Sequence, residues 1–147
     1  MKINDVHEMW EKDCRIDTIN LEKTSVETPI IHAKYLRMYS TATLKLRALE
    51  EDQKKLLKLK WLYYNGKMTK EQMEENGFEY DPFDGLKVLK GEMNYYYDAD
   101  SDIQKSVLKI AYQKEMIATL KEIVDALKWR HQTIRNIIEM RRFEAGA

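Results

Sequence analysis

The chain contains few of the residues that interrupt or cross-link secondary structure. Its 147 residues include one cysteine, two prolines and five glycines, and 34% of them are charged. The single cysteine, Cys14, cannot form an intrachain disulfide or a thiolate metal cluster, which fits a reducing compartment such as the cytoplasm. Because scarce glycine and proline disfavour many short strands joined by turns, this composition predicts a mainly α-helical protein with a single domain.

The chain also lacks long apolar runs and recognisable catalytic motifs. Its N-terminus does not resemble a signal peptide, and no stretch is long and apolar enough to span a bilayer, so we expect no membrane partner. His7, His32 and His131 are too far apart to form a local metal motif. There is no phosphate-binding glycine loop and no nucleophile elbow. We therefore expect no metal, no cofactor and no enzymatic activity.

Charge is sorted into blocks along a chain whose formal net charge is zero. The segment from Gln53 to Lys70 contains six lysines and no acid, whereas Glu71 to Asp84 contains six carboxylates and no base. Zero net charge argues against a general nucleic-acid coat, so any binding must come from a patch. Lysines neutralise phosphates and aromatic rings stack on unpaired bases, which together favour single-stranded nucleic acid as the ligand of the basic segment.

Helical spacing groups the cations with aromatic rings. Lys54, Lys58 and Trp61 recur at i, i+4 and i+7, and with Leu59 facing the core, Lys58 and Lys60 should lie about 100° to either side of it. A lysine run is also typical of a solvated helix face, and aromatic residues at helical spacing are usually buried, so a purely structural role remains open. The predicted DNA-binding residues are Lys54, Lys55, Lys58, Lys60, Trp61 and Lys67.

Two long helices are predicted. Thr28 and Pro29 provide a helix start, and Asn65-Gly66 provides a stop, which together predict a helix over about 29–65. Asp100-Ser101-Asp102 should cap a second helix over about 101–143.

The remaining segments are shorter or irregular. An amphipathic segment is expected over 4–13, and residues 67–100 are predicted to form an irregular connecting arm with at most short helices near Lys70 and Leu86. Tyr95 to Tyr97 could form a strand, but only if another chain supplied its partner. We therefore divide the single domain into an N-terminal DNA-binding part (4–66), the arm (67–100) and a C-terminal oligomerisation helix (101–147).

The last helix carries the clearest periodic pattern of the chain. Seven positions alternate in steps of three and four, and six of them are apolar, which is typical of a coiled-coil or bundle seam. The seam predicts self-association, and its lone histidine is better explained by register or by a single hydrogen bond than by metal binding. The predicted oligomerisation residues are Ile117, Leu120, Val124, Leu127, His131, Ile134 and Ile138. A second basic cluster closes this helix, with complementation of the helix dipole as its purely structural explanation. It consists of Lys128, Arg130, Arg135, Arg141 and Arg142, against the single acid Glu139.

Two segments resemble a known family. One is Lys54–Gly66, a basic helix end followed by a tyrosine pair and a glycine turn, and the other is Met140–Gly146. Their order and spacing, together with the overall length of the chain, resemble the UvsY family of recombination mediator proteins from T-even-type bacteriophages. The resemblance extends over nearly the whole chain. The resemblance places two DNA-contacting basic positions of the family on Lys58 and Lys60, with arginine in the family at the position of Lys60.

The resemblance implies a non-catalytic protein of the host-cell cytoplasm that binds single-stranded DNA. It also implies a ring-shaped homo-oligomer, a hexamer or heptamer assembled through the C-terminal helical region. Such a ring would help a RecA-like phage recombinase to replace the phage single-strand-binding protein during recombination and repair. The alternative is an oligomeric helical scaffold without a nucleic-acid role, which would have the same seam.

Overall fold

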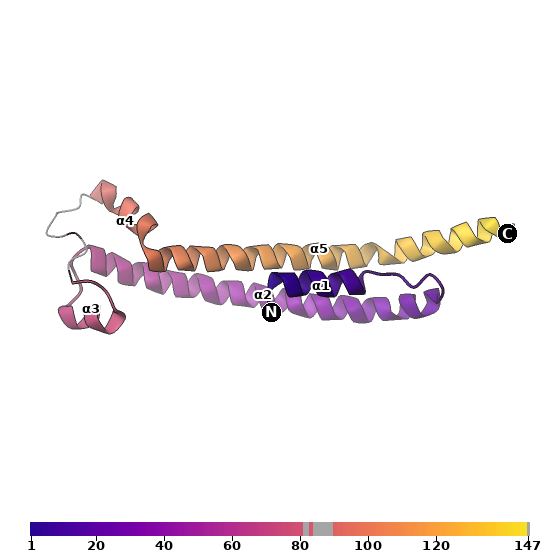
Figure 1. Ribbon diagram of the computed structural model, residues 1–147, viewed down its shortest axis with the longest axis horizontal. Helices are drawn as coiled ribbons and strands as arrows, with labels where there is room; N and C mark the ends of the chain where they lie inside the picture. The colour runs from indigo at the N-terminus through magenta and orange to yellow at the C-terminus, as the bar shows by residue number, and fades with distance from the viewer. Residues whose placement is uncertain (81–82, 84–89, 147) are drawn as a thin grey trace. The chain divides into compact units, whose positions relative to one another are not determined.

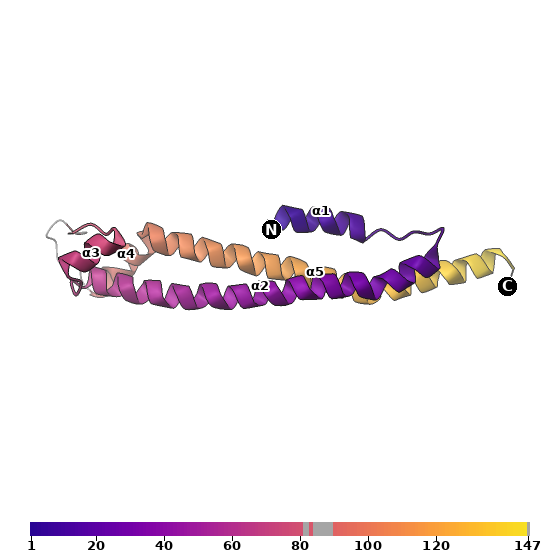
Figure 2. The same cartoon turned by 90° about the horizontal axis from the view of Figure 1, so that it is seen from below.

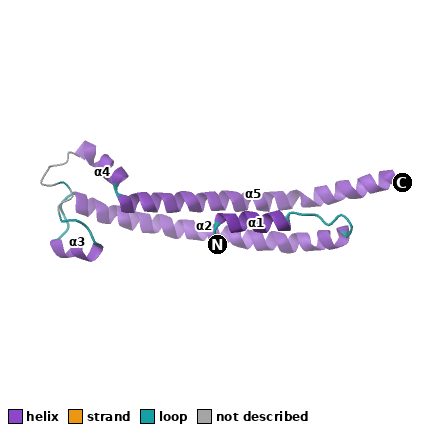
Figure 3. Ribbon diagram, viewed as in Figure 1, coloured by secondary structure: helices purple, strands orange, loops and turns teal. Residues whose placement is uncertain are grey.

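The structure, a computed structural model, describes residues 1–80, 83 and 90–146. Within these residues every regular element is helical and none is a strand, which confirms the mainly α prediction (Figure 1, Figure 3). No helix in this part of the chain is long and apolar enough to cross a membrane. The elements are α1 (Ile3–Asp13), α2 (Leu21–Tyr64), α3 (Lys70–Asn76), the 3-10 helix η1 (Lys90–Glu92), α4 (Met93–Ala99) and α5 (Ser101–Glu144).

The predicted start of the first long helix was wrong. The helix α2 begins at Leu21, because the side chain of Asn20 caps it by accepting a hydrogen bond from the Lys23 amide at 3.0 Å. Pro29 lies inside the helix, at an exposed position where water can reach the carbonyl that has lost its amide partner. The Thr28 hydroxyl, expected to cap, donates instead to the Thr24 carbonyl at 2.8 Å.

The other ends of the long helices agree with the sequence. The helix α2 ends at Tyr64, and Gly66 adopts a positive φ of 67° that a glycine tolerates better than other residues. At the start of α5, one carboxylate oxygen of Asp100 accepts the amides of Asp102 at 2.9 Å and Ile103 at 3.0 Å. The predicted cap is therefore confirmed, and α5 continues to Glu144.

Within the predicted arm, one short helix is confirmed and one interpretation is wrong. The helix α3 begins after Thr69, whose hydroxyl accepts the Gln72 amide at 3.2 Å. The other short helix was expected near Leu86, which lies outside the described residues. Tyr95 to Tyr97 lie in α4 and not in a strand. Their strand preference would need a neighbouring strand, whereas the Tyr97 ring instead packs 5.7 Å from that of Tyr64.

The chain forms two compact units. One comprises Met1–Lys45 and Gln113–Ala147, and the other comprises Leu46–Tyr112. Each unit therefore contains one part of α2 and one part of α5. The predicted division at residues 66 and 100 stays a prediction.

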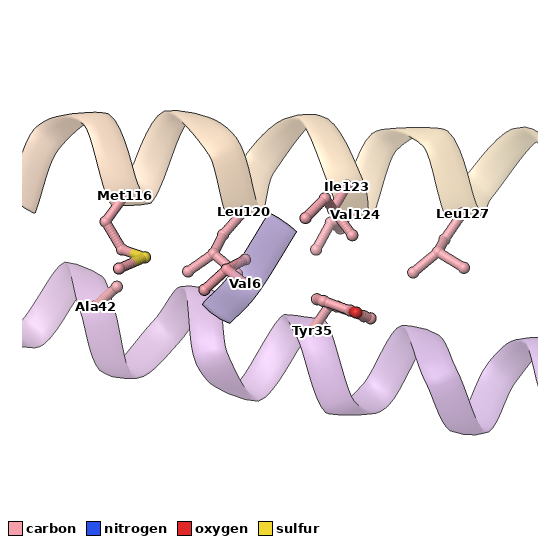
Figure 4. Close-up of a cluster of buried hydrophobic side chains, with 8 residues drawn as sticks. All are labelled: Val6, Tyr35, Ala42, Met116, Leu120, Ile123, Val124 and Leu127. Carbon is pink, nitrogen blue, oxygen red and sulfur yellow. The ribbon is translucent and has the colours of Figure 1, made fainter. Parts of the chain in front are cut away.

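The first unit has an apolar core built by three helices. Val6, fully buried, comes from α1, which packs against α2 and α5 and confirms the amphipathic segment predicted at the N-terminus (Figure 1, Figure 2). Figure 4 shows the buried side chains between the helices. They are Val6 from α1, Tyr35 and Ala42 from α2, and Met116, Leu120, Ile123, Val124 and Leu127 from α5.

Polar contacts attach the end of α1 to the same unit. The Asp13 carboxylate accepts hydrogen bonds from Lys34 at 2.6 Å and from the Tyr35 hydroxyl at 2.8 Å. Burial raises the pKa of Asp13, but these two hydrogen bonds and the positive charges of Lys34 and Arg130 together outweigh it, so this pKa lies below its ordinary value. The guanidinium of Arg130 donates to the carbonyls of Asp13 at 2.8 Å and Arg15 at 2.9 Å.

Two arginines of the C-terminal basic cluster thus have partners inside this unit. Arg130 is buried, and Arg141 donates to the carbonyl of Thr18 in the loop after α1. Complementing the helix dipole, the explanation offered from the sequence, does not account for these contacts.

Candidate nucleic-acid interface

Three of the predicted DNA-binding lysines lie on the surface of α2 in the second unit. Lys54, Lys55 and Lys58 are exposed. The ammonium of Lys54 pairs with Glu51 at 2.8 Å, but both side chains are well exposed, so solvent screens this contact. These lysines can therefore exchange their present surroundings for a phosphate at little cost.

An exposed ring and a cation lie together at the end of the same helix. Trp61 is 44% exposed, and the ammonium of Lys67 lies 4.5 Å from the centroid of its ring. The turn at Gly66 brings Lys67 back to the last helical turn, where its amide donates to the Leu62 carbonyl at 2.9 Å. A flat exposed ring beside a cation can stack on a base while the cation contacts the adjacent phosphate.

Lys60, by contrast, is buried. It was expected on the surface beside the apolar seam, and that expectation was wrong, because the residue is only 4% exposed. Its ammonium pairs with Asp100 at 2.9 Å and Asp102 at 2.8 Å, and it lies 4.0 Å from the centroid of the Phe78 ring. Lys60 therefore does not present its charge to a strand lying on the surface of this structure.

The carboxylate beside Lys60 is held in its charged form. Burial by itself raises the pKa of Asp100, but hydrogen bonds from Tyr64, the Ile103 amide and Lys60 outweigh it and keep this pKa below its ordinary value. The Tyr64 hydroxyl donates to Asp100 at 2.6 Å, and burial together with this carboxylate raises the pKa of Tyr64. Tyr64 is thus a neutral donor throughout the physiological range.

The tyrosine pair belongs to the packing of this unit more than to its surface. Tyr63 is buried, its hydroxyl donates to the Glu79 carbonyl at 2.7 Å, and its ring lies 4.8 Å from that of Phe78. Met68 and Met73 join this cluster. Of the aromatic residues of the basic segment, Trp61 is therefore the one with an exposed ring.

Periodicity could have separated the two central lysines. At about 100° per residue, Lys60 lies about 40° from Leu56 and about 60° from Tyr63, whereas Lys58 lies about 160° from Leu56. Lys60 therefore falls inside a stripe of the usual width, and Lys58 falls on the opposite face. Measured from Leu59, which lies at the edge of that stripe, the two lysines had seemed equivalent.

The predicted oligomerisation seam is largely covered within the chain. Leu120, Val124, Leu127 and Ile134 are buried, and Ile117 packs at the edge of the core formed with α1 and α2. The partner helices expected from another copy are thus helices of the same chain. His131 and Ile138 are exposed, and their role in self-association stays a prediction.

Other apolar side chains of α5 are exposed and were not singled out from the sequence. Phe143 is 80% exposed, and Trp129 and Met140 are exposed as well. Met140 and Phe143 belong to the C-terminal segment that suggested the family, but none of the three fits the three-and-four spacing of the seam. Among the described residues, no group of three or more His, Cys, Asp or Glu side chains is placed to hold a metal ion.

Comparison with known proteins supports the nucleic-acid interpretation. A family model described as "Recombination, repair and ssDNA binding protein UvsY" matches residues 9–147. The recombination protein uvsY of Enterobacteria phage T4 is 27% identical over 146 residues, which cover 99% of each chain.

Solved structures of that phage protein have the same fold. One crystal form of the bacteriophage T4 recombination mediator protein UvsY superposes with a TM-score of 0.82 and 27% identity, covering 99% of this chain and 98% of the other. Another crystal form gives a TM-score of 0.80 and 26% identity, covering 95% and 98%. The resemblance found in the two sequence segments is confirmed, and the chain belongs to the UvsY family of recombination, repair and single-stranded-DNA-binding proteins.

Proposed function

We propose that the protein acts as a recombination mediator that holds single-stranded DNA on the exposed face of α2 and the turn that follows it. The observation that supports this surface most strongly is the pairing of Trp61 with Lys67, one helical turn from Lys58. Lys54 lies on the same stripe and Lys55 beside it. This proposal leaves out Lys60, whose ammonium is already paired with two carboxylates.

The strand binds by two complementary contacts. The exposed lysines replace cations condensed on the DNA phosphates, which makes the affinity depend strongly on salt. A base stacks on Trp61, which disfavours duplex DNA because its bases are already stacked. One chain offers few such contacts. A ring of six or seven copies multiplies them, because linked sites act on one strand at high effective concentration.

The protein promotes recombination by binding and handover, without catalysis. A strand held along the ring is bent away from the path that it follows on a phage single-strand-binding protein, which weakens that complex. The exposed strand is then passed to a RecA-like phage recombinase in the cytoplasm of the host cell.

The test is fluorescence anisotropy of labelled single-stranded and duplex DNA over a salt series. Wild-type protein is compared with Lys58→Ala, Lys67→Ala and Trp61→Ala, and with Lys121→Ala as a matched control at an exposed position of α5. We expect preference for the single strand and a salt slope shallower by about 0.7 for each lysine contact removed. Trp61→Ala should weaken binding by about 1–3 kcal/mol for one stacked base.

Two outcomes would contradict the proposal. If the wild-type oligomer bound no DNA, the scaffold without a nucleic-acid role would be the better explanation. If the three variants bound as tightly as Lys121→Ala, the DNA would lie on a different surface.

A further inference from the structure

Lys60 belongs to a cluster that joins the end of α2 to the start of α5 inside the second unit. Asp100 is the centre of this cluster. One of its carboxylate oxygens accepts the Asp102 and Ile103 amides and so caps α5, and the other accepts Tyr64 at 2.6 Å and Lys60 at 2.9 Å. Asp100 therefore bonds both to the first turn of α5 and to two residues of the last turns of α2.

The net charge of the cluster does not favour a phosphate. Lys60 carries one positive charge, and Asp100 and Asp102 together carry two negative charges within 2.9 Å of it. The ammonium is also covered on one side by the Phe78 ring, 4.0 Å away. A strand that approached this point would meet a buried cation behind an excess of carboxylate charge, which is unfavourable for direct contact.

The aromatic part of the DNA surface proposed above lies at the next residue along the chain. Trp61 follows Lys60 directly, and the turn that places Lys67 over the Trp61 ring starts at Tyr64. In that turn the Gly66 and Lys67 amides donate to the carbonyls of Tyr63 and Leu62. The arrangement of the Trp61 ring and the Lys67 ammonium thus depends on the last turns of α2. In those turns, Lys60 and Tyr64 bond with Asp100.

We propose that Lys60 is a positioning residue for single-stranded DNA binding and not a phosphate contact. Together with Tyr64 it holds the end of α2 on Asp100, and this fixes Trp61 and Lys67 in the arrangement that receives the strand. The inference rests on the proposed DNA surface and adds to it the residues that support that surface from beneath.

Direct contact and positioning predict opposite results for Asp100→Asn. If Lys60 contacted a phosphate, neutralising Asp100 would remove a competing negative charge, and affinity for DNA would be unchanged or higher. If Lys60 positions the helix end, the same substitution weakens its attachment and affinity falls. Asparagine is as good a helix cap as aspartate, so the start of α5 is preserved in this variant.

The experiment measures the affinity of the full-length protein for labelled oligo(dT) at one fixed salt concentration. Lys60→Met and Asp100→Asn are compared with Asp52→Asn, which makes the same charge change as Asp100→Asn at an exposed position of α2. We expect Lys60→Met and Asp100→Asn each to weaken binding at least fivefold, and Asp52→Asn to leave it unchanged or slightly stronger. Lys60→Arg, which can keep both ion pairs, should bind within about twofold of wild type.

Tyr64→Phe provides a test without any change of charge. It keeps the ring and removes only the hydrogen bond to Asp100, so we expect weaker binding and faster hydrogen exchange at the Lys67 amide, with far-UV circular dichroism unchanged. Wild-type affinity in Tyr64→Phe, or affinity in Asp100→Asn equal to that of Asp52→Asn, would overturn the inference. Failure of the proposed surface itself is a separate result, because it would leave Lys58→Ala and Lys67→Ala at wild-type affinity.

Discussion

Replacing Leu120 with alanine distinguishes a seam buried within the chain from one that waits for another copy. Leu120 is only 1% exposed and packs among Val6, Tyr35 and other core residues of the first unit. If its contacts are intramolecular, the substitution removes stability from every copy of the chain, whatever its state of assembly. Leu44→Ala is the matched control, because it makes the same chemical change at an exposed position of α2 in the same unit.

The magnitude follows from the groups removed. Leucine to alanine deletes three carbon atoms, which at about 0.8 kcal/mol each amounts to about 2.4 kcal/mol of lost transfer free energy. The cavity left behind adds to this, so a loss of about 3 kcal/mol is expected, within the range of about 2–5 kcal/mol for such changes. Leu44→Ala should change the free energy of unfolding by no more than about 0.5 kcal/mol.

Urea unfolding followed by circular dichroism at several protein concentrations is the appropriate assay. With a denaturant dependence of about 2 kcal/mol/M, the midpoint of Leu120→Ala should fall by about 1.5 M. The difference from wild type should be the same at every protein concentration, because it arises within one chain. A difference that vanished on dilution would place Leu120 at an interface between copies and would refute this reasoning.

Two of the three further predictions concern polar contacts, and the third concerns the backbone conformation of a turn. Arg130→Met removes the donors to the carbonyls of Asp13 and Arg15. A hydrogen bond to a charged group contributes about 1.5–3 kcal/mol to stability, so hydrogen exchange in the loop after α1 should become faster. Unchanged exchange would contradict the contact. Folding lowers the pKa of Asp13, so the ionised carboxylate stabilises the folded state. This contribution is complete above the unfolded pKa of about 3.9 and is lost as the pH falls through the pKa of the folded state. Asp13→Asn should therefore lower stability at pH 7 and flatten its dependence on pH in acid, measured by urea unfolding at several pH values; an equally steep dependence would count against the shift. Gly66→Ala should lower the melting temperature through about 1 kcal/mol of strain at φ 67°, whereas Gly91→Ala, without a positive φ, should not.

The helix ends show what local sequence can and cannot predict. The Gly66 stop and the Asp100 cap depend on residues next to them in the chain, and both were predicted correctly. The start of α2 was missed because two caps compete there, and Thr28-Pro29 is the more conspicuous in the sequence. Asn20 prevails because its side chain makes the capping hydrogen bond, while one proline at an exposed position does not end the helix.

The sequence predicted the exposed residues of the candidate site, but not the residue that is buried and paired with distant carboxylates. An excess of lysine over acid within 53–70 indicated a basic surface, and Lys54, Lys55 and Lys58 do lie on it. The pairing of Lys60 depends on two carboxylates about forty positions away in the sequence, and no spacing rule relates those positions. The residues next to a lysine therefore do not reveal whether it is buried or exposed. Only its position relative to the apolar stripe of the helix distinguishes the two cases.

The seam of α5 shows the same limit for apolar residues. A repeat of three and four steps predicts that one face of a helix will be covered, but it is satisfied equally by a helix of the same chain or of another. Here α1, from the opposite end of the sequence, supplies Val6 to that face. A second copy that binds α5 therefore meets the side chains that the first copy leaves exposed. His131 and Ile138 are exposed and follow the repeat, whereas Trp129 and Phe143 are exposed and do not.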